Sequence, residues 1–205
     1  NLVVAFAGLV AFVLLRRVGA VPFVAEPLGG ILFFVYQFNL ALAYKKLGKL
    51  DLAQYAYQKY VAAAKPGDAQ AQNALWETFQ IQKDRKDFDG AVATLETIRA
   101  GAKDPETAME VLYRMSEVRL SAGRPDEAIA VWEKMRAAKP AGSQFRLQAL
   151  IKLGEAYEKA NDPGAAAGAY EDLARSTGGE IAKNAAARAA ALRKSSGTLK
   201  PAPKK

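Results

Sequence analysis

The sequence predicts an all-helical repeat fold behind an apolar N-terminal segment, and three observations lead to this prediction. From about residue 34, amphipathic stretches of 12–18 residues follow one another, separated by short Gly/Pro/Asp clusters. Four of these stretches carry a similar short phrase at nearly equal intervals. No stretch shows the period-two alternation of apolar and polar residues that marks a half-buried strand.

Composition limits the classes of function. The 205 residues are 51% hydrophobic and 24% charged, enough for one ordinary domain with a core. The absence of Cys and His excludes disulfides, thiolate zinc sites, iron–sulfur ligation, covalent haem attachment, a Cys nucleophile and a His general base. Only half of the net charge of +8 falls on residues 39–194, which is too little to favour nucleic-acid binding. We therefore expect a non-enzymatic protein with no catalytic residues, metal, cofactor or nucleic-acid partner.

The N-terminal segment, residues 1–17, is predicted to be a membrane anchor that crosses the bilayer as a transmembrane helix. Residues 2–15, LVVAFAGLVAFVLL, have no polar face, and Arg16-Arg17 closes the run. The run is shorter than the ~20 residues of a full span, and residues upstream would have to complete it. One alternative is the apolar region of a signal peptide, although its positive charge would normally come first. A buried core helix is the other alternative.

Residues 18–33 are predicted to form an apolar connector at the membrane surface. Pro22, Pro27 and the pair Gly29-Gly30 are typical helix breakers. The connector leads directly into the next helix, so the anchor and the first repeat are expected to pack together. At the other end, residues 195–205 are rich in Ser, Gly, Pro and Lys and are predicted to be a disordered basic tail.

The repeats occupy residues 34–178. The shared phrases are Leu50-Asp51-Leu52-Ala53, Phe88-Asp89-Gly90-Ala91, Pro125-Asp126-Glu127-Ala128 and Pro163-Gly164-Ala165-Ala166. The final alanines are 38, 37 and 38 residues apart. Four positions after each alanine comes a large residue, in order Tyr57, Leu95, Trp132 and Tyr170. The alanine would let two helices approach closely, and the large residue lies on the same helix face and fills the gap between neighbours.

This pattern resembles the tetratricopeptide repeat, whose signature is W-x2-L-G-x2-Y, then A-x3-F, then P. The fourth unit matches best, through Leu150, Leu153, Gly154, Tyr157, Ala166 and Tyr170. The second and third units have Gln82 and Arg119 where an aromatic residue is usual. The resemblance implies a right-handed superhelical stack of about four helix pairs, with residues 179–194 as the C-terminal capping helix. Because the period exceeds 34 by about one helical turn, we expect longer first helices.

The resemblance also implies that the first helix of each pair lines a concave partner-binding groove. The candidate groove residues are Asn39, Lys46, Asn73, Trp76, Glu77, Gln80, Tyr113, Arg114, Glu117, Lys152 and Glu155. Chaperone-binding members of the family hold an acidic C-terminal peptide with Lys, Asn and Arg. Three glutamates intrude here, so capture of such a peptide is not expected. Trp76 and Tyr113 are either binding anchors or packing residues between helices.

The function predicted is that of a membrane-anchored scaffold for protein–protein interaction, as an assembly factor or accessory subunit of a larger membrane protein complex. The layout resembles that of thylakoid tetratricopeptide repeat proteins that help assemble photosystem I. The alternative is a bacterial periplasm-facing protein in envelope biogenesis, secretion or chaperone assistance. The partners expected are subunits of a membrane complex, together with membrane lipid through residues 1–38.

The position of positive charge predicts a single-pass protein whose repeats lie on the cytoplasmic or stromal side. Arg16-Arg17 directly follows the apolar run, and positive residues flanking a span tend to stay on the cytoplasmic side. A larger basic cluster further upstream would reverse this orientation. Lys45, Lys46 and Lys49 would either face anionic headgroups or complement the dipole of a solvated helix end.

Overall fold

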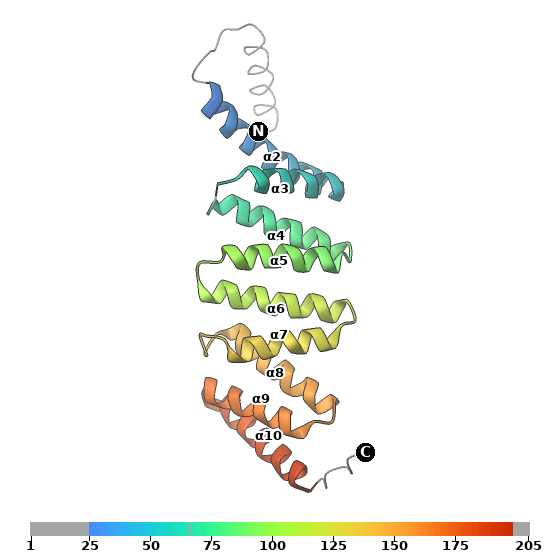
Figure 1. Ribbon diagram of the computed structural model, residues 1–205, viewed down its shortest axis with the longest axis vertical. Helices are drawn as coiled ribbons and strands as arrows, with labels where there is room; N and C mark the ends of the chain where they lie inside the picture. The colour runs from blue at the N-terminus through green and yellow to red at the C-terminus, as the bar shows by residue number, and fades with distance from the viewer. Residues whose placement is uncertain (1–24, 66, 199–205) are drawn as a thin grey trace. The chain divides into compact units, whose positions relative to one another are not determined.

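The computed structural model describes residues 25–65 and 67–198 (Figure 1). Its helices are α2 (Ala25–Lys46), α3 (Leu50–Ala63), α4 (Ala69–Asp84), α5 (Phe88–Gly101), α6 (Pro105–Ser121), α7 (Pro125–Ala137), α8 (Gln144–Lys159), α9 (Pro163–Ser176) and α10 (Gly179–Thr198). This part of the chain has no strand, which confirms the all-helical prediction. The predicted anchor, residues 1–17, lies outside the described residues. Of the helices described, none is both long and apolar enough to cross a membrane.

The chain divides between Arg85 and Lys86 into two compact units. In the first unit α2 packs against α3, and α3 packs against α4. In the second unit each helix from α5 to α10 packs against the next (Figure 1), and α6 also contacts α8. The contact between α6 and α8 joins the first helices of two successive pairs, which is the contact that stacking of repeats requires.

Two predicted boundaries are wrong. The helix α2 begins at Ala25, so the predicted connector of residues 18–33 is helical from residue 25 onward. Pro27 is only the third residue of α2, where a backbone N–H has no partner within the helix. At the other end, α10 continues to Thr198, so residues 195–198 of the predicted tail are helical. The rest of that tail, residues 199–205, lies outside the described residues.

The repeat register is visible in the backbone of the turns. The turn that follows each first helix has one residue with a positive φ, namely Gly48 (69°), Lys86 (60°), Gly123 (72°) and Asn161 (56°). These residues have the same 38-, 37- and 38-residue spacing as the signature alanines. In three of the turns, the next residue donates its backbone N–H to a carbonyl five positions earlier, at 2.9 Å. This bond is part of the Schellman motif that ends a helix.

Aspartate and proline residues fix where several of the helices begin. Aspartates accept a hydrogen bond from a backbone N–H of the first turn at four helices, through Asp68, Asp87, Asp104 and Asp162. Proline is the first residue of α6, α7 and α9, where its fixed φ suits the helix. The first helices α4, α6 and α8 have 16, 17 and 16 residues, against 14, 14, 13 and 14 for α3, α5, α7 and α9.

The core confirms the predicted register. The four signature alanines, Ala53, Ala91, Ala128 and Ala166, are each 0% exposed. Of the large residues four positions later, Tyr57, Leu95 and Trp132 are buried and Tyr170 is half-buried. In the third pair, the Trp132 ring nitrogen donates to the Ser116 hydroxyl at 2.8 Å. In the fourth pair, a Cβ added to Gly154 would lie 2.6 Å from Cζ of Tyr170. The large residue thus lies against a small one on the first helix of its pair.

The helix α10 has the form predicted for a capping helix. Over residues 179–195, whose side chains the structure describes, Ala185 and Ala189 are buried and most of the others are exposed. Arg193 donates two hydrogen bonds to the Glu171 carboxylate of α9, at 2.9 and 3.1 Å. Arg188 pairs in the same way with Glu158 of α8. One face of α10 therefore closes the apolar surface of α9, and the other is solvated.

Two tyrosines at equivalent repeat positions are expected to respond differently to loss of the hydroxyl. Among the residues that the structure describes, the buried Tyr57 hydroxyl has no hydrogen-bond partner, and burial, with the nearby Glu77, raises its pKa to about 12. Burial and a hydrogen bond to Glu158 likewise raise the pKa of Tyr170 to about 12. Tyr57→Phe should leave the free energy of unfolding unchanged or raise it by up to about 1 kcal/mol, whereas Tyr170→Phe should lower it by about 1 kcal/mol. Urea unfolding of the two variants measures the difference, and equal losses would contradict it.

Candidate partner-binding faces

The first unit presents one set of predicted groove residues on α4. Asn73, Trp76, Glu77 and Gln80 are spaced i, i+3, i+4 and i+7 and therefore share one side of the helix. Asn73 is exposed and the other three are half-buried. The Trp76 ring meets Phe79 edge to face, with centroids 5.8 Å apart and an interplanar angle of 81°. Trp76 thus packs against its own helix and keeps part of its surface accessible.

The polar residues around Trp76 have partners of their own. Glu77 forms an ion pair with Lys45 of α2, which links two first helices of this unit. The Gln80 side chain donates to Asp84 at 2.7 Å. The predicted Asn39 and Lys46 lie exposed on α2. Lys45 and Lys46 are adjacent lysines, so the sequence alone could not predict which of them forms the ion pair with Glu77.

The second unit brings three predicted residues together between α6 and α8. Tyr113 of α6 is half-buried and packs against Phe145 of α8, with centroids 6.0 Å apart. Glu117 of α6 and Lys152 of α8 lie close enough to act on the Tyr113 hydroxyl. Burial raises the pKa of Tyr113, Glu117 raises it further, and Lys152 opposes them. An aromatic pair flanked by one carboxylate and one cation therefore bridges the two helices.

The remaining charges of this face form local pairs. Arg114 donates to Glu110 at 2.9 and 2.6 Å, and Lys152 donates to Glu155 at 3.1 Å. Sequence reasoning missed both Glu110 and Phe145. The helical spacing already applied to this face would have found them, because Glu110 precedes Tyr113 by three residues and Phe145 precedes Lys152 by seven.

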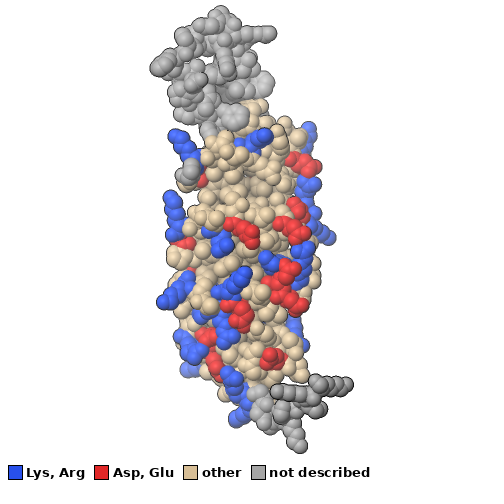
Figure 2. Space-filling model, in the orientation of Figure 1, with Lys and Arg blue, Asp and Glu red and all other residues tan. Residues whose placement is uncertain are grey.

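Both faces combine a half-buried aromatic ring with charges of both signs. On the surface drawn in Figure 2, Lys and Arg lie among Asp and Glu, without a large area of one sign. Such a surface suits a partner with apolar anchors and mixed polar groups better than a polyanion. In the described part of the chain, no group of three or more acidic side chains could hold a metal ion.

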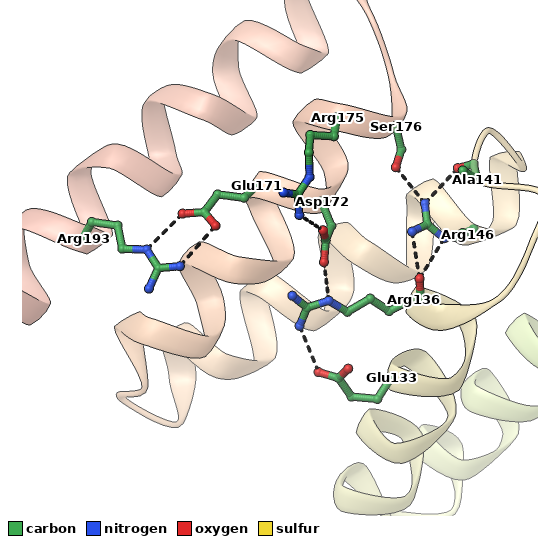
Figure 3. A network of polar contacts seen from close by, with 9 residues as sticks. All are labelled: Glu133, Arg136, Ala141, Arg146, Glu171, Asp172, Arg175, Ser176 and Arg193. Atoms are coloured by element: carbon green, nitrogen blue, oxygen red, sulfur yellow. Dashed lines mark hydrogen bonds and ion pairs between the residues drawn. The ribbon is translucent and has the colours of Figure 1, made fainter.

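A polar network lies at the junction of α7, α8 and α9 (Figure 3), and the sequence analysis did not predict it. Arg146 of α8 is only 7% exposed. It donates to the backbone carbonyl of Arg136 at 3.1 and 2.7 Å, to that of Ala141 at 2.8 Å and to the Ser176 hydroxyl at 2.7 Å. Burial lowers the pKa of Arg146, Asp172 opposes this change, and the neighbouring Arg136 adds to it.

Asp172 of α9 is the acidic centre of this network. Burial alone would raise its pKa, but hydrogen bonds from Arg175 and Arg136 outweigh burial and hold the pKa below its usual range. Arg136 also pairs with Glu133 (Figure 3). The bonds of this network connect Arg136 of α7 with Arg146 of α8 and Asp172 of α9, so we assign it to holding the three helices together.

Comparisons with known proteins agree with this architecture. A tetratricopeptide repeat family model matches residues 148–176. A search of curated proteins found no significant match. A solved tetratricopeptide repeat protein from Parabacteroides merdae is 13% identical with a TM-score of 0.54, and the match covers 80% of this chain but only 61% of that one. A MamA structure is 17% identical over 83% of this chain and 98% of that one, but its TM-score of 0.47 is too low to support an inference. The fold is therefore of the tetratricopeptide repeat type.

Proposed function

We propose that this protein, a helical-repeat scaffold of the tetratricopeptide type, holds protein partners at a membrane without catalysing a reaction. It would act as an assembly factor or accessory subunit of a larger membrane protein complex. The observation that carries the proposal is the half-buried pair of Tyr113 and Phe145 between α6 and α8. Partly accessible aromatic residues at a junction of two helices are typical anchors of protein interfaces.

The membrane part of the proposal is supported by the sequence. Residues 2–15 are uncharged and apolar, and α2 follows them closely, beginning at Ala25. An anchor there would keep the repeats near the bilayer, where the subunits of a membrane complex are found. The two arginines after the apolar run favour repeats on the cytoplasmic or stromal side.

A periplasm-facing protein of envelope biogenesis, secretion or chaperone assistance is the second candidate, favoured if the charge upstream of residue 1 outweighs Arg16-Arg17. Protease treatment of sealed, right-side-out cells or spheroplasts separates the two. Digestion of residues 40–205 from outside, with the membrane intact, would favour the second candidate. Protection of those residues until the membrane is opened would favour the first.

We expect the double variant Trp76→Ala/Tyr113→Ala to capture its partners at least tenfold more weakly than the parent. Truncation of an aromatic anchor commonly costs about 2 kcal/mol or more in binding free energy, and 1.4 kcal/mol is a factor of ten. The measurement is purification of tagged protein from native membranes in mild detergent, followed by quantitative mass spectrometry. Helical circular dichroism should remain near that of the parent.

The matched control for Tyr113 is Tyr157→Ala. Both tyrosines are half-buried and pack against the same apolar cluster, but Tyr157 donates its hydroxyl to Glu133 of α7 at 2.9 Å. The control should lose similar stability and retain its partners. If Tyr157→Ala loses the same partners as the double variant Trp76→Ala/Tyr113→Ala, the loss follows from weakened folding, and Tyr113 is a packing residue.

A further inference from the structure

The first unit has a cluster of exposed apolar side chains on the turn after α2 and the outward side of α3. Leu47 is 68% exposed, Leu52 is 44% exposed and Tyr55 is 59% exposed. Leu52 and Tyr55 are three residues apart and share a side of α3. The other strongly exposed large apolar residues of the described chain, Leu120 and Ile181, lie on separate helices. Scattered residues of that kind are ordinary, but three within nine positions call for an explanation.

Three lysines accompany these apolar side chains. Lys46 and Lys49 flank Leu47 and are exposed, and the Lys59 ammonium lies 5.4 Å from the centre of the Tyr55 ring. In the part of the chain that the structure describes, no carboxylate lies within ion-pair distance of any of the three.

Two acidic side chains of the first unit have cationic partners outside this set of lysines. Asp51, at the start of α3, forms an ion pair with Arg85, and Glu77 forms one with Lys45. The six residues Lys46, Leu47, Lys49, Leu52, Tyr55 and Lys59, hereafter the α2–α3 patch, therefore combine apolar tips with three uncompensated positive charges.

We propose that the α2–α3 patch docks the first unit on an anionic membrane surface. Leucine side chains would enter the boundary between headgroups and acyl chains, tyrosine favours that interface, and lysine ammonium groups would pair with lipid phosphates. The patch is small for a protein partner, since a stable protein interface takes about 20–30 residues from each side. The docking does not require residues 1–17 to span a bilayer, so it can be tested apart from the proposed anchor.

The test uses the full chain and site-directed spin labels. The chain has no Cys, so Leu47→Cys and Leu52→Cys each provide a unique attachment point. Ala130→Cys, exposed on α7, is the control position. Labelled protein is mixed with vesicles of phosphatidylcholine alone or with an equal amount of phosphatidylglycerol. Accessibility of the label to oxygen and to a water-soluble nickel complex then reports its depth.

Labels at positions 47 and 52 should become accessible to oxygen and shielded from nickel in the anionic vesicles only, while the label at position 130 remains aqueous. Replacing Lys46, Lys49 and Lys59 by Gln should weaken this insertion by on the order of 100-fold. The same replacement at Lys83, Lys103 and Lys134, which are exposed, removes an equal charge and should have a much smaller effect.

Labels that stay aqueous at positions 47 and 52 in anionic vesicles would overturn the proposal, even if the chain floats with neutral vesicles through its anchor. Insertion at these positions without flotation on neutral vesicles would support the patch and contradict the anchor. Immobilised labels that remain aqueous in native membranes would indicate a protein on the patch and would also overturn the lipid proposal. The proposal would also be overturned if replacing the three control lysines weakened insertion as much as replacing Lys46, Lys49 and Lys59.

Discussion

Replacing Gly154 by alanine is expected to destabilise the second unit by up to about 2 kcal/mol, although alanine is the better helix former. Helix propensity alone favours alanine by about 1 kcal/mol. Against this, the new Cβ would lie 2.6 Å from Cζ of Tyr170 and 2.8 Å from two further ring atoms. Overpacking of this kind costs about 1–3 kcal/mol. The Tyr170 hydroxyl is held by Glu158, so the ring cannot easily move aside.

The same reasoning predicts a change of sign when the ring is removed. In a Tyr170→Ala background, Gly154→Ala meets no ring and should stabilise the protein by about 1 kcal/mol. Gly164→Ala is the matched control, because its Cβ would meet only a carboxylate oxygen of Asp162 at 3.5 Å. Urea unfolding of the four variants of the cycle gives the coupling free energy. A stabilising Gly154→Ala in the parent would mean that Tyr170 does not lie against Gly154.

The register of the repeats was accessible from the sequence because it rests on residue size and spacing. A small residue every 37 or 38 positions, with a large one four positions later, has few physical explanations other than the close contact of two helices. The structure places all four signature alanines at 0% exposure. The start of α2 could not be predicted in the same way. A proline such as Pro27 breaks a helix when it lies in the middle, but it is tolerated in the first turn. The sequence does not distinguish those cases.

The candidate faces were only partly predictable. Helical spacing put Trp76, Glu77 and Gln80 on one side of α4, and the structure agrees. Which charges pair across helices depends on side-chain positions that spacing does not determine. The pairing of Glu77 with Lys45, 32 residues earlier, is of that kind.

Arg146 is the clearest case of a residue whose role was hidden in the sequence. An arginine near the start of an amphipathic helix usually belongs to a solvated face. Here α7 ends beside it, and the last carbonyls of a helix have no partners within that helix. Arg146 supplies donors to the carbonyl of Arg136 in the last turn of α7 and to that of Ala141 in the following loop.

Arg146→Met is therefore expected to lower the free energy of unfolding by roughly 3–5 kcal/mol, the largest effect of a single substitution that we predict. The methionine keeps the apolar part of the side chain but removes every donor. Two backbone carbonyls and the Ser176 hydroxyl then lose the hydrogen bonds that Arg146 donates to them. Arg146→Lys should recover part of the loss, because one ammonium group cannot reach all three acceptors.

Arg175→Met is the matched control for the effect of charge. Arg175 contacts the same network through Asp172, but its side chain is 73% exposed, so its removal should cost less than about 1 kcal/mol. Urea unfolding measures all three variants, and amide hydrogen exchange locates the change. Protection in Arg146→Met should fall first at the end of α7 and in the loop that leads to α8. If Arg146→Met and Arg175→Met unfold at the same urea concentration, the Arg146 guanidinium is solvated and does not hold these helices together.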